Sequence, residues 1–317
     1  MKILWLLSLS ILHAADFEWT QAMQRARDLQ NAGNYTNAEI VMTSALALAE
    51  KFDPRDARLA RSLSGLASVN QDLAKYDAAE KLYRRAIAAI EQNLGPDDPA
   101  LIEPLNGLAS LYHQTRRYAQ AGQLTRRCLA LPQDRRATAQ QLGNLAAVYQ
   151  AEHKYAEADD FYRRALDMFE ASGGPASSEM AFTLNNLGSL HMSTGNAHEA
   201  AAYLERAVAM WETTLGASHP IYAQGLGNLA YLYSVTGRAA EAESLWTRAL
   251  ALAEKTLGAQ HPIYGALLSG YADSLKQCGR TAEAKRIRRR SQAILAAKSD
   301  SVSGRLVDYR DLFRQAR

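Results

Sequence analysis

The sequence predicts an all-helical protein in which about seven antiparallel helical hairpins stack into a solenoid. Hydrophobic residues make up 48% of the 317 residues, and the apolar ones are mostly Ala and Leu, which favour helices. Runs of Val, Ile and Thr, which are typical of strands, are nearly absent. A marker pair, an apolar residue followed by Ala or Gly, recurs at spacings of 42, 37, 42, 42 and 42 residues. Such a period indicates a solenoid, because one hairpin cannot bury its apolar face alone.

The N-terminus has the three-part form of a secretory signal peptide. Lys2 precedes an apolar run over residues 3–12, and the small residues Ala14 and Ala15 follow after His13. The run of ~10 residues is short for a membrane span, which needs about 20. We therefore expect residues 1–15 to be a signal peptide and the mature chain to be exported, periplasmic or secreted. The alternative is an uncleaved leader that holds the chain at a membrane.

The solenoid is expected over residues 16–297, followed by a C-terminal tail over 298–317. The first copy is degenerate, and the other six carry the marker pair. The markers begin at Leu66, Leu108, Leu145, Leu187, Leu229 and Tyr271. The copies are expected near residues 17–56, 57–98, 99–135, 136–176, 177–219, 220–261 and 262–297.

Each copy is expected to hold two helices, A and B. Helix A carries the marker pair; in the sixth copy Leu226, Leu229 and Tyr233 have helical spacing. Helix B is expected to begin ten residues after the marker, and small residues recur three and ten residues after its start. Small side chains let two helices approach closely, because the ridges of one must enter the grooves of the other. These small residues are Ala79, Ala121, Ala158, Ala200, Ala242 and Ala284, then Ala86, Cys128, Ala165, Ala207, Ala249 and Ser291.

The turn between helices A and B is expected to need a left-handed residue. Glycine occupies that position as Gly33, Gly195, Gly237 and Gly279. Copies two to four have Ala74, Arg116 and His153 there instead, at some cost in backbone energy.

The phrase "LGASHP" is interpreted as the joint between two copies. Gly216 should end helix B with a positive φ, and Pro220 should begin the next helix A, where a missing N–H costs nothing. His219 lies between them at the N-cap position. The same order recurs as Gly258, His261 and Pro262, and with a stronger cap residue as Gly95, Asp98 and Pro99.

The third copy departs from this pattern. Its end, "LALPQDRRATAQ", is five residues shorter than the others. We expect helix B to stop near Leu131–Pro132, because Pro cannot continue a helix. A local change of curvature is expected between copies three and four. Pro104 leaves two alternatives: helix A of copy three begins near Ile102, or it is kinked.

The repeat resembles the tetratricopeptide repeat, in the 42-residue variant found in kinesin light chains and many bacterial scaffolds. The phrases "NLAYLY", "YAEADDFYRRAL" and "LGASHP" carry the likeness, which covers residues 17–297. The resemblance implies a right-handed superhelix whose A helices line a concave groove. It also implies that the chain binds a protein or peptide ligand.

No pattern in the sequence predicts catalysis or a cofactor. Phosphate-binding loops, paired His motifs and nucleophile elbows are missing from the chain. The joint histidines lack partners for a metal site, because stacking holds equivalent positions apart. The net charge of +3 is too small to indicate nucleic acid. The recurring pairs Arg84-Arg85, Arg126-Arg127 and Arg163-Arg164 fit a solvated helix face or an anionic partner.

The two cysteines are expected not to form a disulfide, because four repeats separate them. Cys128 stands where other copies have Ala and should be a buried, inert thiol. Cys278, at the end of a helix A, should be a free thiol.

The candidate binding site is a row of polar residues on the groove-facing side of the A helices. An Asn carboxamide can pair with both the N–H and the C=O of an extended peptide. The resemblance assigns this role to Asn144, Asn186 and Asn228, whereas Gly65, Gly107 and Gly270 depart from it. The candidate groove residues are Asn106, His113, Gln140, Asn144, Asn185, Asn186, Gln224, Asn228 and Tyr231.

Two functions remain open at this point. The first is a non-enzymatic scaffold that holds a protein or peptide in the groove. The second is a structural spacer or assembly platform that acts through its convex faces and ends, with the asparagines bracing neighbouring helices instead. The tail is expected to cap the last repeat or to be disordered; filling the groove of a neighbouring molecule is the alternative.

Overall fold

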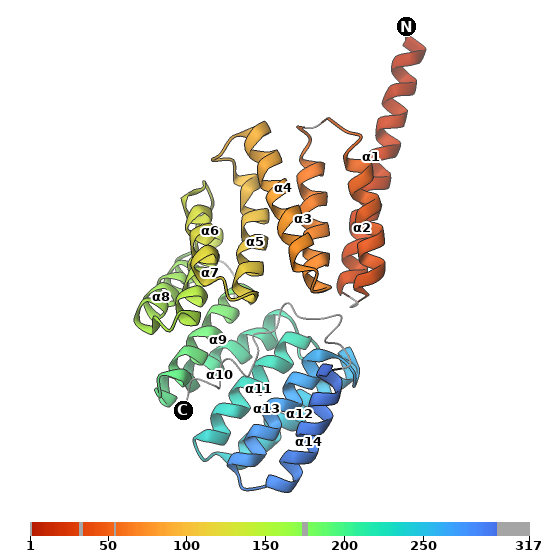
Figure 1. Cartoon of the computed structure of the whole chain (residues 1–317). Coiled ribbons are helices and arrows are strands. Elements are labelled where there is room, and N and C mark those ends of the chain that lie inside the picture. The colour runs from red at the N-terminus through yellow and green to blue at the C-terminus, as the bar shows by residue number, and fades with distance from the viewer. Residues whose placement is uncertain (1, 32–33, 54, 173–176, 297–317) are drawn as a thin grey trace. The chain divides into compact units, whose positions relative to one another are not determined.

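The computed structural model describes residues 2–31, 34–53, 55–172 and 177–296, with side chains from residue 15 onward. The predicted all-helical fold is confirmed: the described part contains fourteen α-helices and no strand (Figure 1). The helices are α1 (Lys2–Asn31), α2 (Tyr35–Ala49), α3 (Ala57–Asp72), α4 (Tyr76–Leu94), α5 (Ile102–Gln114), α6 (Tyr118–Ala130), α7 (Arg135–Ala151), α8 (Tyr155–Ala171), α9 (Ser178–Ser193), α10 (Ala197–Thr214), α11 (Pro220–Val235), α12 (Ala239–Leu257), α13 (Pro262–Gln277) and α14 (Thr281–Ala296). A 3₁₀ turn, η1 (Pro99–Leu101), precedes α5.

The chain divides into two compact units within the short joint of the third copy. The first unit ends at Gln133 and holds α1–α6; the second begins at Asp134 and holds α7–α14. The change of curvature expected at this joint stays a prediction.

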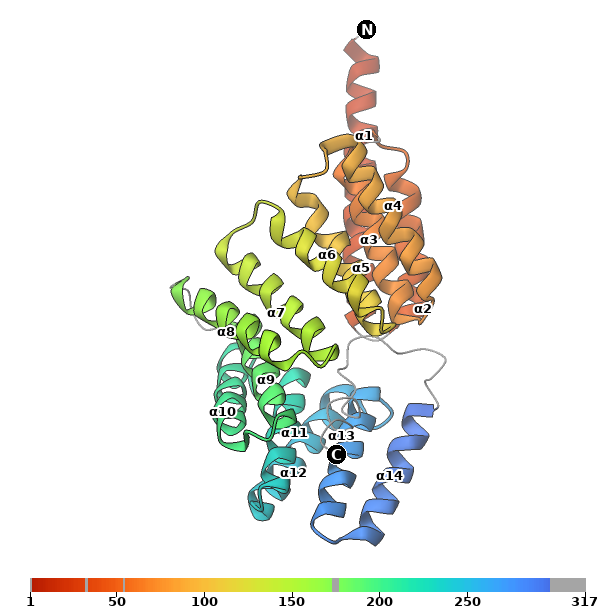
Figure 2. The same cartoon turned by 60° about the vertical axis from the view of Figure 1, so that its left-hand side comes forward.

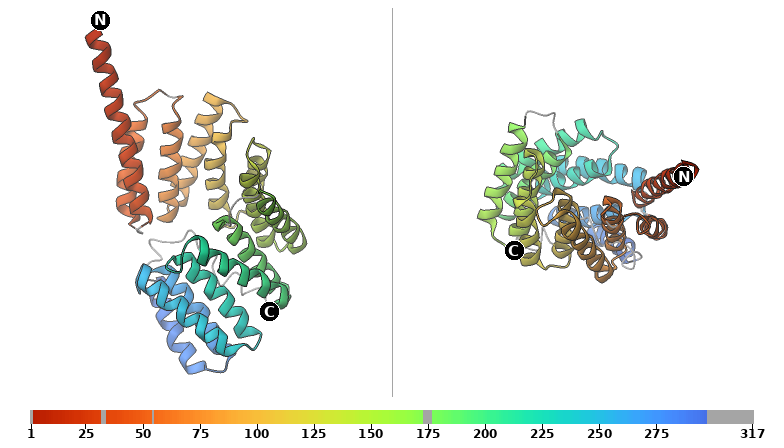
Figure 3. Two further views of the ribbon diagram at one scale, coloured as in Figure 1. Left: turned by 180° about the vertical axis from the view of Figure 1, so that it is seen from behind. Right: turned by 90° about the horizontal axis from the view of Figure 1, so that it is seen from above.

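Consecutive helices pair as antiparallel hairpins inside each unit. The odd-numbered helices are the A helices and the even-numbered ones the B helices, and within each unit a hairpin contacts the next one of that unit. Figure 2 shows α7 to α10 as two successive hairpins, and Figure 3 (left, teal to blue) shows α11 to α14 from behind. Every B helix from α4 onward begins at the residue that the repeat spacing predicts.

The recurring small residues lie where each B helix meets the A helices. Eleven of the twelve are at most 2% exposed, and Ala284 is 6% exposed. A larger side chain at these places would force the helices apart, since packed interiors hold few voids. The predicted role of these positions in close helix packing is confirmed.

The A-to-B turns use left-handed residues as predicted. Ala74, Arg116 and His153 have φ values of 57°, 62° and 61°, and Gly195, Gly237 and Gly279 also have positive φ. The next backbone N–H donates to a carbonyl five residues back, for example Lys75 N to Asn70 O at 2.8 Å. This Schellman arrangement satisfies carbonyls that the helix end leaves free. Gly33 lies outside the described residues.

The joints between hairpins also match the prediction. Gly216 has φ +83°, α11 begins at Pro220, and His219 Nδ1 accepts a hydrogen bond of 3.2 Å from the Ile221 N–H. His261 caps α13 in the same way, accepting from Ile263 N at 3.2 Å. In the earlier joint, Asp98 accepts from Ala100 N at 2.8 Å. The phrase "LGASHP" is therefore a helix stop, a cap and a helix start.

Two helix boundaries resolve what the prolines left open. Helix α5 begins at Ile102 after η1, so Pro104 falls in its first turn, where no kink is needed. Helix α6 ends at Ala130, just before Leu131–Pro132, as predicted.

At the N-terminus, α1 runs without a break from Lys2 to Asn31, so the expected leader and the first helix A form one helix. Leu and Ala at the end of the leader favour continuation of the helix, and no Gly or Pro separates the two parts. Leader cleavage stays a prediction. None of the helices in the described part is both long enough and apolar enough to span a membrane.

Candidate functional site

The second unit holds seven of the nine candidate groove residues. They lie on α7, α9 and α11, and α7 contacts α9, α9 contacts α11 and α11 contacts α13 in succession. Asn106 and His113 lie on α5 of the first unit. The candidates in the second unit differ in how far their side chains are available to a ligand.

Asn228 and Asn185 are brought together by the stacking of α11 on α9. Asn228 Nδ2 donates to Asn185 Oδ1 at 2.7 Å, and the residues are 7% and 9% exposed. Asn228 Oδ1 is buried without a hydrogen-bond partner in the described part. This pair braces two A helices, in the way that the structural alternative required.

Asn186 and Asn144 occupy the position of Asn228 in the two preceding A helices. The Asn186 side chain is half-buried and is hydrogen-bonded to the hydroxyl of Tyr162 on α8, whose pKa is raised by burial. Asn144 is exposed on α7, and its side chain makes no hydrogen bond within the described residues. Of the three asparagines that the resemblance singles out, Asn144 therefore has the most freely available carboxamide.

The glycines that interrupt the asparagine row have a packing cause. A Cβ on Gly107 would lie 2.2 Å from the Tyr83 ring, and one on Gly270 would lie 2.7 Å from the Trp246 ring. A Cβ on Gly65 would likewise lie 2.9 Å from the Met42 side chain. These large side chains occupy one equivalent position in the preceding B helix, and a Cβ on any of the three glycines would clash with them. Tyr162 holds the same position before α9, where its hydroxyl is instead hydrogen-bonded to Asn186.

The remaining candidates of the second unit lie at the surface or partly below it. Gln140 is exposed on α7, while Gln224 and Tyr231 are half-buried on α11. Burial, with a smaller contribution from the carboxylate of Asp273 on α13, raises the pKa of the Tyr231 hydroxyl. Together with Asn144, these side chains offer amide and hydroxyl groups and no net charge.

The sequence reasoning missed Phe182, an apolar side chain that lies on the same α9 as Asn186. Phe182 is 41% exposed and stacks edge-on against Trp211 of α10, with ring centroids 5.1 Å apart. The buried Trp211 Nε1 has no hydrogen-bond partner among the described residues. Phe182 falls 42 residues after Gln140 and 42 before Gln224, and this equivalence was the available signal.

The two candidates of the first unit are less available. Asn106 is half-buried, and its Oδ1 is buried without a hydrogen-bond partner in the described part. His113 is half-buried and packs edge-on against Tyr118 at 5.4 Å. The use of any of the nine residues by a ligand stays a prediction.

Two further groups from the sequence have structural explanations. Cys128 is fully buried, as expected, and burial raises the pKa of its thiol to about 12. Cys278 is exposed, and both cysteines are free.

The recurring arginines pair with the preceding copy. Arg85 pairs with Glu50 and Arg127 with Glu91, each at 2.6 Å. The same link recurs from Arg206, Arg248 and Arg290 to Glu170, Glu212 and Glu254. Ion pairs between consecutive B helices thus engage Arg85 and Arg127, whereas Arg163 and Arg164 pair within α8 with Asp159 and Asp160. Such exposed pairs contribute ~0–1 kcal/mol each.

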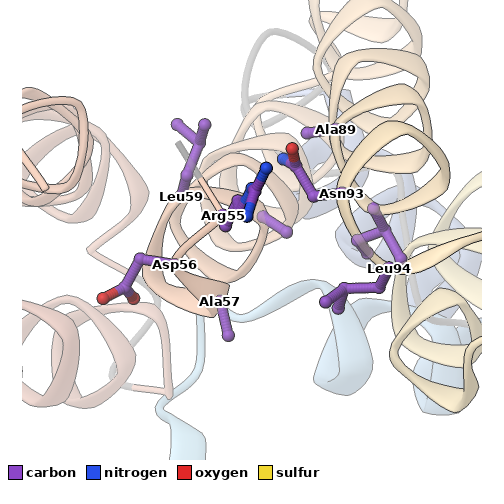
Figure 4. Close-up of a pocket in the computed structure, with 9 residues that line it drawn as sticks. Arg55, Asp56, Ala57, Leu59, Ala89, Asn93 and Leu94 are labelled. Carbon is purple, nitrogen blue, oxygen red and sulfur yellow. The ribbon is translucent and has the colours of Figure 1, made fainter. Parts of the chain in front are cut away.

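One pocket lies in the first unit, where α3 begins beside the last turn of α4 (Figure 4). Its carboxylate, Asp56, is committed to the fold. Asp56 caps α3 by accepting from Arg58 N at 2.8 Å, and hydrogen bonds from the Arg58 guanidinium lower the pKa of its carboxyl. Figure 4 shows the Asp56 carboxylate turned away from Asn93 and Leu94. None of the nine candidates lines this pocket. Within the described residues, no group of three or more His, Cys, Asp or Glu side chains could hold a metal ion.

Comparison with known proteins decides the family. The model of the tetratricopeptide repeat matches residues 19–92, 58–134, 135–213, 179–237 and 222–297. The chain belongs to the tetratricopeptide repeat family. No curated protein matches the sequence.

Solved structures show the same fold at low sequence identity. The chain is similar to BtubC (BKLC) of P. vanneervenii, with 22% identity, a TM-score of 0.55, and coverage of 72% of this chain and 91% of that one. It is also similar to a kinesin light chain-type protein of Podospora anserina with nearly identical repeats, with 23% identity and a TM-score of 0.51. That match covers 64% of this chain and 99% of the other. A Rap protein complexed with Competence and Sporulation Factor has 14% identity and a TM-score of 0.53. That match covers 90% of this chain and 99% of the other. These likenesses support the kinesin light chain-like form of the repeat fold.

Proposed function

We propose that the chain is an exported, non-enzymatic scaffold that holds an extended segment of a protein or peptide in the groove lined by α7, α9, α11 and α13. The observation that carries the proposal is the row of neutral polar groups on successive A helices. Gln140 and Asn144 are exposed, and Asn186 and Gln224 are half-buried at the equivalent positions of the next hairpins. Carboxamides at this regular spacing can pair with the N–H and C=O groups of a peptide without reading its sequence.

Phe182 adds an apolar contact to this polar row. It is 41% exposed at the position held by Gln140 and Gln224 in the neighbouring hairpins. An apolar side chain of the ligand that covers Phe182 would remove its ring from water, which stabilises the complex by roughly 25 cal/mol per Å² buried. The expected ligand is therefore an extended segment with an apolar residue between uncharged stretches.

The test is a selection from a random peptide library displayed on phage, with the full chain as bait. Affinities of the selected peptides are then measured by fluorescence anisotropy for the wild type, for Asn144→Ala/Phe182→Ala, and for the control Asp167→Ala/Lys255→Ala. The control residues are exposed on B helices and make no ion pair within the described part. We expect the groove variant to bind at least about tenfold more weakly, which corresponds to ~1.4 kcal/mol, and the control to bind like the wild type. Failure to select any peptide, or equal affinities for all three proteins, would refute the groove.

Export rests on the predicted leader and is tested separately. N-terminal sequencing of the protein released from cells should begin close to Asp16. A mature protein that still begins at Met1 would favour the membrane-held alternative.

A second function, an assembly platform acting through its ends, is favoured by the charge of α14. Helix α14 is not among the helices that line the proposed groove.

A further inference from the structure

The last helix differs from the other B helices of its unit in charge. Helix α14 carries five cations and one carboxylate, whereas the whole chain has a net charge of only +3. The other B helices of the second unit are acidic: α8 has five carboxylates and two cations, α10 three and one, and α12 three and two. The positive charge of the chain is therefore concentrated on one end hairpin.

One of the five cations has a structural role at the end of the stack. Arg288 occupies the position where Tyr83, Tyr162 and Trp246 pack in other B helices. Its guanidinium donates to Ser269 Oγ at 2.7 Å and pairs with Asp273 on α13. A polar side chain at this place suits a terminal repeat, which has no further hairpin to cover it.

The other four cations form a stripe on the exposed side of α14. One ridge of the helix carries Lys285 and Arg289, which are four residues apart and so lie one turn above each other. The neighbouring ridge carries Arg286 and Arg290 in the same arrangement. All four are exposed, whereas Ala284, Ser291 and Ile294 are buried on the opposite side. The stripe extends for about 7.5 Å along the helix axis.

The fold leaves two of these four charges without a partner in the described part of the chain. Arg290 links to Glu254 at 3.4 Å, and Arg286, with a side chain 78% exposed, is 3.9 Å from Glu283. Lys285 and Arg289 make no ion pair or hydrogen bond with the described residues. Like charges four residues apart destabilise a helix, and none of these cations lies in the last turn, where the helix dipole would favour it.

We propose that the basic stripe of α14, made by Lys285, Arg286, Arg289 and Arg290, is a docking surface for an acidic segment of a partner protein. Three of its four side chains are guanidinium groups, which bind carboxylates through two parallel hydrogen bonds. A stripe of this length matches two or three acidic residues of an extended chain, at about 3.4 Å per residue. Apart from the cations, the exposed residues of α14 are Thr281, Ala282, Gln292, Ala293 and Ala296, and not the large apolar residues by which amphipathic helices enter a membrane. These features favour an acidic protein segment over a lipid surface.

The test uses charge reversal at the two cations without partners. A labelled glutamate-rich peptide, and its glutamine-substituted counterpart, are titrated against the full chain, against Lys285→Glu/Arg289→Glu, and against the control Lys51→Glu/Lys81→Glu. The control changes the net charge equally at exposed lysines of the first unit that make no ion pair among the described residues. Circular dichroism verifies that each variant is folded.

We expect the glutamate peptide to bind the wild type and the control alike, and to bind Lys285→Glu/Arg289→Glu about tenfold more weakly. Raising the salt from about 50 to about 200 mM should weaken binding to the wild type, because the stripe is exposed to solvent. The glutamine peptide should not bind. The proposal is overturned if the two charge-reversal variants lose affinity equally, or if the glutamate peptide does not bind. It is also overturned if only phosphatidylserine vesicles bind the stripe, or if the reversal abolishes self-association and nothing else.

Discussion

The side chain of Asn228 donates a hydrogen bond of 2.7 Å to Oδ1 of Asn185 and so joins α11 to α9. Both residues are less than a tenth exposed. Asn228→Ala removes the donor and leaves the buried acceptor of Asn185 unpaired, which should lower the free energy of unfolding by about 1–3 kcal/mol. Urea unfolding followed by tryptophan fluorescence measures this, since Trp211 and Trp246 are buried in the same core.

Two further variants separate bracing from general loss of polarity. Asn185→Ala/Asn228→Ala should lose less stability than the sum of the single variants, because the pair is lost only once. Asn144→Ala, at the equivalent but exposed position, should stay within about 0.5 kcal/mol of the wild type. If Asn228→Ala were as mild as Asn144→Ala, the hydrogen bond would contribute nothing to the stack.

Gly270 should be intolerant of a side chain even though it lies inside a helix. A Cβ there would lie 2.7 Å from Trp246 Cη2, and the indole is held by a hydrogen bond of 2.8 Å from Nε1 to Ser274 Oγ. Gly270→Ala should therefore destabilise the protein by about 1–3 kcal/mol through overpacking. Thermal or urea unfolding would detect the change.

Gly143 provides the matched control on α7. A Cβ there meets only Thr183 Oγ1, at an ordinary contact distance of 3.6 Å. Gly143→Ala should raise stability by up to ~1 kcal/mol, because Ala favours the helix and loses less backbone entropy on folding. Equal effects of the two substitutions would mean that the Trp246 ring shifts at little cost to make room for the added methyl group.

Much of this fold could be predicted from the sequence because its signals are local and repeat. The residues of a joint such as Gly216, His219 and Pro220 act within six positions of one another, so their roles follow from helix-end chemistry. The small positions recur in every copy, which makes their shared packing role visible without coordinates.

The site could be predicted only in part because its side chains depend on residues in another helix. The Tyr83 ring of the preceding B helix leaves no room for a side chain at Gly107, and Asn228 is hydrogen-bonded to Asn185 of the preceding A helix. The link from Arg85 to Glu50 also joins two copies, and nothing local in either copy specifies it. Comparing each copy with the one before it, rather than aligning copies alone, would have revealed these relations.

The two cysteines should differ sharply toward alkylating reagents. Cys128 is fully buried with a pKa raised to about 12, so almost no thiolate is present at pH 8, whereas Cys278 is exposed. Iodoacetamide should modify Cys278 in the native protein and both residues in urea, as peptide mass spectrometry would show. Native labelling of Cys128 at a comparable rate would mean that α6 opens readily.

Stability should fall in alkali as tyrosines with partly buried hydroxyls ionise. Burial, together with hydrogen bonds to Glu205 and Glu243, raises the pKa of Tyr233 and Tyr271 to about 12. In the unfolded chain a tyrosine has a pKa of about 10. The folded state therefore keeps its protons where the unfolded state releases them, and this contribution to stability is complete below pH ~10 and is lost as the pH rises toward 12.

Urea unfolding at a series of pH values measures this loss, and absorbance near 295 nm follows the tyrosinates directly. Tyr233→Phe/Tyr271→Phe removes both hydroxyls, so its free energy of unfolding should decline less steeply between pH 10 and 12 than that of the wild type. An unchanged slope would show that these two hydroxyls do not govern alkaline stability. In that case the loss of stability in alkali would come from other tyrosines whose pKa is raised by burial, such as Tyr112, Tyr222 and Tyr264.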